Sequence, residues 1–319
     1  MTAVGWPLSL DDLRMAEAII RPQIHWTPVL TSRSLDAIAG AELHFKCENF
    51  QKGGAFKFRG ASHAVLCLSD AEAANGVATH SSGNHAAALA LAATLRSVPT
   101  YVVMPRTTLQ VKQQAVAAFG AEITLCEPTP EAREAGLAAV QARTGAVIIH
   151  PYNDERIIAG QASVGLELLG DVRRLNTILV PVGGGGLASG VCLAVAYLSP
   201  MTRVVGVEPE VADDARRSLE AGRIIPSQNP ETIADGLRTS LGDLTFQVLQ
   251  EHLENIVTVS EEAIARAMRL VWERLKIVIE PSAAVTAAVA LEGLGDLAGQ
   301  RVGVVLSGGN ADLDRLPWL

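Results

Sequence analysis

Short apolar runs alternate with longer amphipathic segments along this chain, and the alternation predicts its secondary structure. The short runs are of strand length, whereas the longer segments repeat their apolar positions with helical periodicity. The predicted strands are 43–47, 76–79, 100–104, 121–125, 146–149, 177–182, 203–208, 256–259 and 301–306. The predicted helices are 9–20, 58–68, 83–95, 109–119, 131–143, 157–169, 187–198, 261–275 and 283–291. Strands that alternate with helices predict right-handed crossovers and an α/β fold with a mostly parallel sheet.

One segment, 179–198, carries no charged side chain and is long enough to cross a bilayer. Its first half contains Pro181 and four consecutive glycines, which are the residues that most disfavour a continuous helix. We therefore interpret the segment as a strand, a loop and a helix, and we expect no membrane association.

Composition narrows the class of protein. The 319 residues are 49% hydrophobic but only 4% aromatic, which suits an α/β protein with a buried parallel sheet. The net charge of −8 disfavours binding to nucleic acid or to an anionic membrane.

The cysteines Cys47, Cys67, Cys126 and Cys192 lack the spacing of a metal site. Each lies among apolar residues, so we expect small, buried and reduced side chains. Reduced cysteines, together with the lack of a basic segment before Trp6, predict a cytoplasmic protein.

The strongest chemical signal is the run from Gly183 to Gly186, between a predicted buried strand and a predicted helix. Without side chains, the backbone N–H groups of such a loop can close around an oxyanion at the positive end of the helix dipole. A glycine turn that serves only packing is the alternative, but it carries a large entropic cost. The sequence therefore predicts a phosphate ester as ligand.

Three phosphate ligands compete for this loop. A Walker-type nucleotide loop requires Lys and Ser or Thr after the last glycine, where Leu187 and Ala188 stand. A dinucleotide such as NAD fits the loose pattern Gly183-x-Gly185-x-x-Ala188, with Glu208 as a ribose contact, and would indicate an oxidoreductase. A small phosphorylated cofactor such as pyridoxal phosphate (PLP) requires a lysine elsewhere in the chain.

Lys57 is the lysine to consider, since it lies between Phe56 and Phe58 at the start of a predicted helix. Burial beside apolar rings and the helix dipole both disfavour an ammonium, so we expect a lowered pKa. An amine of that kind is suited to covalent attachment of a carbonyl cofactor. A solvent-exposed lysine with no special role is the alternative.

The segment 45–60, FKCENFQKGGAFKFRG, resembles the cofactor-lysine segment of fold-type-II PLP enzymes, and most closely that of the serine/threonine dehydratase and serine racemase branch. Other motifs of that branch follow in the same order and cover nearly the whole chain. They are 81–85, the glycine run, 207–214, 234–236, 271–281 and 307–310.

This resemblance implies a tryptophan synthase β-like fold with two lobes, each built on a mostly parallel sheet flanked by helices. Residues 1–75 and 150–319 would form the large cofactor-binding domain, and residues 76–149 a small mobile domain. The small domain would close over the substrate and exclude water from the site.

The resemblance also implies roles for residues around the cofactor. Lys57 would bond to it and remove the Cα proton of the substrate, and Phe56 would pack on its ring. Asn84 would hydrogen-bond to its phenolic oxygen, while Ser307 would face its pyridine nitrogen. A neutral hydroxyl there makes the ring a weaker electron sink, which suits β-elimination. Its phosphate would be bound by Gly183, Gly184, Gly185, Gly186 and Leu187.

The substrate and a metal ion are assigned to residues by the same resemblance. The implied substrate-binding residues are Ser81, Ser82, Gly83, Asn84, His85, Tyr152 and Gly236. Ser82 would act on the opposite face of Cα from Lys57. Glu208, Asp214 and the carbonyl of Ala212 would bind Mg²⁺, Ca²⁺ or Mn²⁺, since hard cations prefer oxygen ligands. A solvated acidic turn is the alternative for these residues.

The implied activity is that of a homodimeric PLP-dependent ammonia-lyase, which dehydrates a β-hydroxy-α-amino acid such as L-serine or L-threonine to a 2-oxo acid and ammonia. A serine racemase, or a dehydratase of 3-hydroxyaspartate or 3-phenylserine, is the alternative within the family. Ala86 and Ala87 replace a Gly-Gln pair of the racemases, so nucleotide activation is not expected, and Tyr152 replaces a common Phe or Asn.

Overall fold

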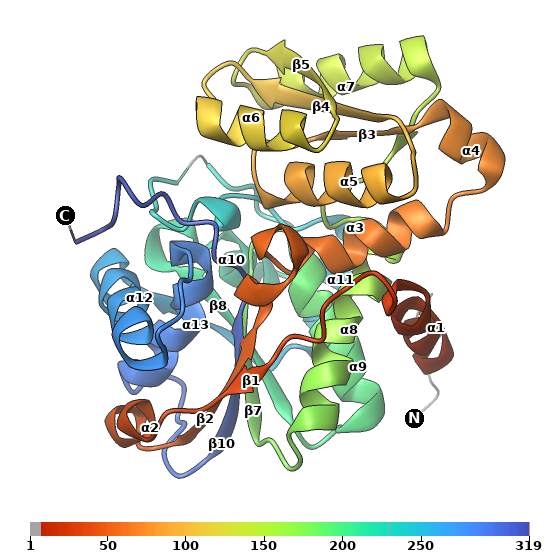
Figure 1. Ribbon diagram of the computed structural model, residues 1–319. Coiled ribbons are helices and arrows are strands. Elements are labelled where there is room, and N and C mark those ends of the chain that lie inside the picture. Colours follow the sequence, from red (N-terminus) through yellow and green to blue (C-terminus); the bar gives the residue numbers. More distant parts are fainter. Residues whose placement is uncertain (1–7, 229, 319) are drawn as a thin grey trace.

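The computed structural model describes residues 8–228 and 230–318, so the segment before Trp6 lies outside the described residues. Two sheets organise the chain, with strand orders β1-β2-β10-β7-β8-β9 and β5-β4-β3-β6 (Figure 1). The strands are β1 Val29–Leu30, β2 Glu42–Cys47, β3 Val77–His80, β4 Thr100–Pro105, β5 Glu122–Cys126, β6 Val147–Ile148, β7 Thr177–Pro181, β8 Arg203–Pro209, β9 Asn255–Val259 and β10 Arg301–Leu306. All strand pairs are parallel except β1 with β2, so the α/β fold predicted from the sequence is confirmed.

Helices cover both sheets. The α-helices are α1 Leu10–Ile20, α2 Arg33–Ala39, α3 Lys57–Leu66, α4 Asp70–Asn75, α5 Asn84–Leu95, α6 Gln110–Ala118, α7 Pro130–Thr144, α8 Glu155–Asp171, α9 Gly186–Leu198, α10 Asp214–Ala221, α11 Asp243–His252, α12 Glu261–Leu275 and α13 Pro281–Leu291. Single turns of 3-10 helix are η1 Glu48–Phe50, η2 Lys52–Gly54, η3 Glu210–Ala212 and η4 Asp235–Leu237. Within the described ranges, no helix combines the length and the apolarity that a bilayer crossing requires.

The six-stranded sheet is buried on both faces. Successive residues of a strand point to opposite faces, and so Val304 of β10 joins the core beneath α12 and α13, whereas Val305 joins the core beneath α8 and α9. Figure 1 shows these helix pairs on either side of the sheet. Burial on both faces explains why the strands are nearly continuous apolar runs.

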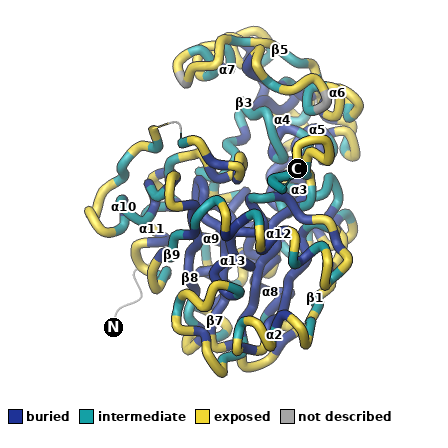
Figure 2. The backbone as a smooth tube through the Cα atoms, turned by 90° about the vertical axis from the view of Figure 1, so that its left-hand side faces the viewer, coloured by how far each residue is buried: buried dark blue, intermediate teal, exposed yellow. Residues whose placement is uncertain are grey.

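The four-stranded sheet lies above the larger one in Figure 1, and it too is packed against helices on both faces. Val103 of β4 packs in the core that includes Leu137 of α7, and Val102 packs with Ala86 and Ala90 of α5 on the opposite face. Figure 2 colours much of α6 and α7 as exposed, whereas α5 is largely buried. Every strand of the small sheet falls within the predicted small domain, 76–149.

Helix α3 packs against both α5 and α8, and Lys57 is its first residue. Val65 of α3, Leu89 of α5 and Ile157 of α8 share one apolar core. Since α5 belongs to the small sheet and α8 covers the large one, α3 places its N-terminus where the two sheets meet.

A buried ionic network fixes α3 from beneath. The fully buried Arg59 guanidinium donates to Glu48 at 2.7 and 2.8 Å and to Glu167 at 2.8 Å through two of its nitrogens. Lys46 Nζ donates to the same Glu167 carboxylate at 2.7 Å and to Thr27 O at 2.8 Å. Two cations and two carboxylates thus balance in the interior, two residues from Lys57.

Candidate active site

The segment that carries Lys57 is attached to the carboxyl end of β10. The Phe56 N–H donates to the Ser307 carbonyl at 3.0 Å, and Ala55 forms an antiparallel bridge with Gly308. Lys57 and Ser307 lie far apart in the sequence, yet these backbone hydrogen bonds bring them to the same edge of the large sheet.

The Lys57 amine is enclosed. Its Nζ donates to the Pro151 carbonyl at 3.0 Å and lies 5.0 Å from the centroid of the Phe56 ring. Burial lowers the pKa of Lys57 to about 8, and the Glu280 carboxylate opposes this shift. The lowered pKa predicted from the sequence is therefore found, with desolvation as its main cause.

The glycine run forms the loop between β7 and α9. Gly185 adopts a left-handed conformation (φ 87°) and caps α9. A Cβ on Gly183 would lie 3.0 Å from the Gly236 carbonyl, and one on Gly184 would overlap the Tyr152 ring. The N–H groups of residues 183–186 donate to no atom in the described part of the chain. The loop thus has the unpaired donors and the close packing that a phosphate cradle requires.

Residues 150–152 connect the lysine to the glycine loop. Pro151 holds Lys57, and Tyr152 rests against Gly184 and Gly186. Two neighbouring residues thus contact Lys57 on one side and the glycine run on the other. Burial raises the pKa of Tyr152, so its phenol is neutral near pH 7.

Asn84 is the first residue of α5, and both ends of its amide have partners. Its Nδ2 donates to both oxygens of Glu280 at 2.9 and 3.1 Å, and its Oδ1 accepts from Asn310 at 2.9 Å. Burial raises the pKa of Glu280 to about 7. These contacts join the small sheet to the edge of the large sheet that carries Ser307.

The loop from Ser81 to His85 lies between β3 and α5. The Ser81 N–H donates to Val103 O at 3.2 Å, and the Ser81 hydroxyl accepts from the Gly83 N–H at 3.3 Å. Gly83 caps α5, so the following N–H groups lie at a helix N-terminus, where a carboxylate is favoured. Ser82 is half-buried in the same loop. His85 is buried, and its Nε2 lies 3.3 Å from the Ile149 carbonyl oxygen. Burial lowers the pKa of His85 well below the usual range.

The predicted metal ligands come together at the end of β8. Glu208 and Asp214 are each only 1% exposed, and Ala212 is buried between them in the sequence. Glu208 accepts from the N–H groups of Ala215 and Arg216 at 3.0 and 2.9 Å, whereas the described residues give the Asp214 carboxylate no hydrogen bond of normal geometry. Burial raises their pKa values to about 8 and about 6.

Neither of these two carboxylates forms an ion pair within the described part of the chain, because the nearby Arg216 and Arg217 side chains pair with Asp213 instead. A divalent cation would supply a direct counter-charge. Among the described residues, no three His, Cys, Asp or Glu side chains are grouped to hold a metal. A cation here would therefore need oxygen atoms from the backbone or from water in addition to the two carboxylates.

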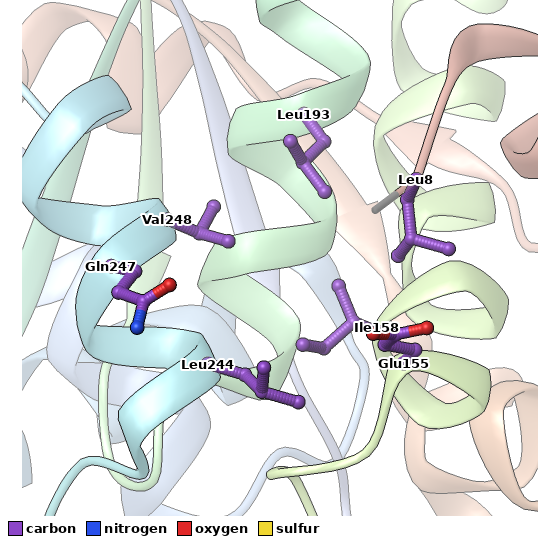
Figure 3. A pocket seen from close by; sticks show the side chains of 7 residues that line it. All are labelled: Leu8, Glu155, Ile158, Leu193, Leu244, Gln247 and Val248. Carbon is purple, nitrogen blue, oxygen red and sulfur yellow. The ribbon is translucent and has the colours of Figure 1, made fainter. Parts of the chain in front are cut away.

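Two features lie outside this arrangement. A small cavity between α8, α9 and α11 is lined by none of the predicted site residues (Figure 3). The expectation that all cysteines are buried is wrong for Cys67, which is exposed at the end of α3, and for Cys126, which is half-buried. Cys67 follows the last residue of α3, whereas Cys126 ends β5 and packs at the rim of the core that contains Val103. All the cysteines are free thiols, as predicted.

Comparison with known proteins agrees with this geometry. The family described as "Pyridoxal-phosphate dependent enzyme" matches residues 20–308. The chain belongs to this family. A beta-hydroxyaspartate dehydratase from Paracoccus denitrificans is 52% identical, with 97% of this chain and 98% of the relative covered. A serine racemase from Arabidopsis thaliana is 48% identical, with 95% and 93% covered. The structure of maize serine racemase superposes with a TM-score of 0.95 at 45% identity, covering 97% of this chain and 95% of that one.

Membership of the PLP family decides between the ligands considered for the glycine loop, because these enzymes use one phosphate and a lysine rather than a dinucleotide. The sequence assigned no role to Glu280, His80 or His150, although each stands at the end of a predicted strand or the start of a predicted helix.

Proposed function

We propose that this enzyme dehydrates a β-hydroxy-α-amino acid, with 3-hydroxyaspartate as the favoured substrate, and releases a 2-oxo acid and ammonia. One observation carries the proposal: the Lys57 amine, with its pKa of about 8, is connected through Pro151 and Tyr152 to a glycine loop whose N–H groups have no acceptor among the described residues. When bound, PLP withdraws electrons from Cα and so makes the Cα proton acidic.

Each side chain around the cofactor has a task in this proposal. Lys57 would bond to the cofactor, then take the Cα proton once the substrate has displaced it. Phe56 would pack on the ring, and Ser307 would face the ring nitrogen. The Asn84 Nδ2, which donates to both Glu280 oxygens, would turn one of its hydrogens to the phenolic oxygen. Residues 183–187 would bind the phosphate.

The substrate would be oriented by its α-carboxylate, held by N–H groups of the 81–85 loop, with Tyr152 and Gly236 beside it. Loss of the Cα proton and of the β-hydroxyl removes one water molecule. A second water then replaces the nitrogen, so that the net products are the 2-oxo acid and ammonia.

Serine racemisation is the second candidate. It is supported by Ser82, which lies in the loop between β3 and α5 at a helix N-terminus and would return a proton to the face of Cα opposite Lys57. A panel of L-serine, L-threonine, 3-hydroxyaspartate and 3-phenylserine separates the two activities. Release of 2-oxo acid supports the dehydratase, and Cα exchange without ammonia supports the racemase.

The lysine is tested with Lys57→Ala and, as a control, the exposed Lys276→Ala. Lys57→Ala should abolish both the near-visible absorbance of lysine-bound PLP and the release of 2-oxo acid, whereas Lys276→Ala should retain both. Absorbance and activity that survive in Lys57→Ala would overturn the proposed role.

We also propose that Glu208, Asp214 and the Ala212 carbonyl bind Mg²⁺, Ca²⁺ or Mn²⁺. Two buried carboxylates with raised pKa values support this, since a cation would relieve their desolvation and mutual repulsion. Chelation should lower the melting temperature of the wild-type enzyme, and Asp214→Asn should remove that sensitivity. An unchanged melting temperature on chelation would contradict a bound cation.

Residues 76–149 are proposed to move as a small domain against 1–75 and 150–319. The strand order of the small sheet supports this division, since none of its strands pairs with the large sheet. A cytoplasmic homodimer, as expected from the family resemblance and the reduced cysteines, completes the proposal.

A further inference from the structure

Two imidazoles at the end of the small sheet have no part in the chemistry proposed above. His80 ends β3, and His150 follows β6, the strand that pairs with β3 in parallel. Their ring centroids lie 6.4 Å apart, with the ring planes nearly perpendicular at 88°. They therefore form one cluster at the edge of the sheet where the substrate loop begins.

The tautomer of His150 is fixed by its own loop. Its Nδ1 lies 2.9 Å from the Asn153 N–H and 3.3 Å from the Tyr152 N–H, and both groups donate to it. A ring nitrogen that accepts N–H hydrogen bonds carries no proton, so the proton of the neutral ring resides on Nε2. Burial, His80 and Lys57 lower the pKa of His150 to about 4, which keeps this N–H donor neutral near pH 7.

His150 lies within the candidate active site. The next residue, Pro151, accepts the Lys57 hydrogen bond, and the His150 ring packs edge-on against Tyr152 with centroids 4.6 Å apart. Tyr152 in turn rests on Gly184. The Nε2 of His150 makes no hydrogen bond to the described residues, so the donor is available to a ligand.

The charged surroundings favour an anion. Lys57 is the cation that acts on His150 near pH 7, and the acidic groups that act on it are Asp154 and Asp243. Asp154 is bound to the Arg156 side chain at 2.7 and 3.0 Å, so its charge is largely compensated.

His80 has a similar environment. Arg133 and Glu134 of α7 are the charged groups that act on it, and Arg133 has the larger effect. The Nε of Arg133 is buried without a hydrogen-bond partner among the described residues. Arg133 thus brings a positive charge and one unpaired N–H group toward the cluster from α7.

We propose that His80 and His150 bind the β-carboxylate of the substrate, with the His150 Nε2–H as a fixed donor, so that the site selects 3-hydroxyaspartate over serine and threonine. This inference rests on the proposed dehydratase function and deepens it. A hydroxymethyl or methyl group at the same place would leave these N–H donors unpaired, whereas a carboxylate accepts from both rings.

The test variants are chosen from the different roles of the two ring nitrogens of His150, Nδ1 as an acceptor and Nε2 as a donor. His150→Asn retains an acceptor near the position of Nδ1, and so preserves the loop hydrogen bonds, but it removes the donor at Nε2. His80→Asn alters the second ring independently of that loop. The exposed His25→Asn serves as the matched control.

The measurement is ligand binding to the PLP-loaded enzyme, followed by the change in cofactor absorbance. L-aspartate carries the β-carboxylate without a leaving group, and L-alanine carries no β-substituent. We expect His150→Asn to weaken L-aspartate binding roughly ten- to hundredfold, the effect of losing one charge-assisted hydrogen bond. L-alanine binding should change less than about twofold, and His25→Asn should resemble the wild type.

The inference would be overturned if a variant weakened the binding of L-aspartate and L-alanine equally. It would also be overturned if neither His150→Asn nor His80→Asn weakened the binding of L-aspartate. Its failure is distinguishable from failure of the proposed function. A wild type that releases no 2-oxo acid from any β-hydroxy amino acid contradicts the function itself, whereas an active wild type with unchanged L-aspartate preference in the variants contradicts only the carboxylate site.

Discussion

At the scale of single residues, one enclosed amine sets the pH range in which this enzyme captures its cofactor. The pKa of Lys57 is lowered to about 8 because burial penalises the ammonium. Below this pH the amine is mostly protonated and cannot attack a carbonyl. Above it, the free amine is the main form.

We therefore expect the rate at which cofactor-free enzyme captures PLP to rise between pH 7 and pH 9 and then to level off. The free amine grows from roughly a tenth to roughly nine tenths of the total over this range. Rapid mixing with PLP, followed by absorbance, measures the rate. N-acetyl-lysine gives the reference curve, with its inflection near pH 10. An enzyme curve that matched the reference would contradict the lowered pKa.

A second prediction at the residue scale concerns Gly184, whose missing side chain leaves room for the Tyr152 ring. Gly184→Ala would displace that ring and distort the loop, so we expect PLP affinity to fall at least about tenfold, since one lost hydrogen bond to an anionic phosphate already has this effect. Equilibrium dialysis against PLP measures it. Gly170→Ala is the matched control, because a Cβ there meets nothing within 4 Å. A similar loss in both variants would indicate a general effect on folding.

At the scale of elements, the network beneath α3 determines how firmly Lys57 is placed. Arg59 makes hydrogen bonds to Glu48 and Glu167, and all three side chains are fully buried. Removal of one partner from such a group leaves uncompensated charge in the interior, which is far more costly than the loss of a surface pair.

Arg59→Met is thus expected to lower the free energy of unfolding by about 3–5 kcal/mol. Urea unfolding of the PLP-loaded enzyme, followed by circular dichroism, measures the change. Arg266→Met is the control, because Arg266 pairs with Glu292 at the surface and such pairs contribute about 0–1 kcal/mol. Equal effects of the two substitutions would show that the buried network does not stabilise α3.

Long periodic elements are predictable from the sequence, and short ones are not. Helix α12 combines a Ser260 cap with a regular apolar face, and its predicted range, 261–275, is the observed one. Helices α2, α4, α10 and α11 and strand β1 are absent from the prediction. Helices α2, α4 and α10 and strand β1 have at most eight residues, too few for a periodicity to stand out, and tertiary packing stabilises them. Helix α11 has ten residues, one more than the predicted α6, so its length does not explain its absence from the prediction.

The residues of the candidate site also differ in whether the sequence can predict them. Glycine runs and a lysine between aromatic residues carry a local signal, so the amino-acid sequence alone is enough to propose Lys57 and residues 183–186 as site residues. Glu280 carries no such signal, because before Pro281 it resembles any residue at the start of a helix. Only the fold brings its carboxylate to Asn84, just as only the fold brings His80 to His150.

At the scale of the whole molecule, the two lobes meet through the apolar core that α3, α5 and α8 share and through polar contacts beside it. Asn84 reaches Glu280 from α5, and Lys112 of α6 forms an ion pair with Asp235 of η4, with 2.6 Å between Nζ and Oδ2. The side chains of the pair are 37% and 50% exposed, so salt should weaken the pair. It links the predicted small domain to a turn of the large one beside Gly236.

If the small domain closes over the substrate, Lys112→Met should favour the open form. We expect KM to rise about two- to fivefold and kcat to change less, because an exposed ion pair contributes less than about 1 kcal/mol. The wild-type KM should rise toward the variant's as salt is added, and Lys112→Asp combined with Asp235→Lys should restore it. Steady-state kinetics at low and high salt measure this. Arg143→Met is the control, since Arg143 pairs with Glu122 inside the small domain at 2.6 Å. An equal rise in KM in Arg143→Met would mean that the Lys112–Asp235 ion pair has no special part in closure.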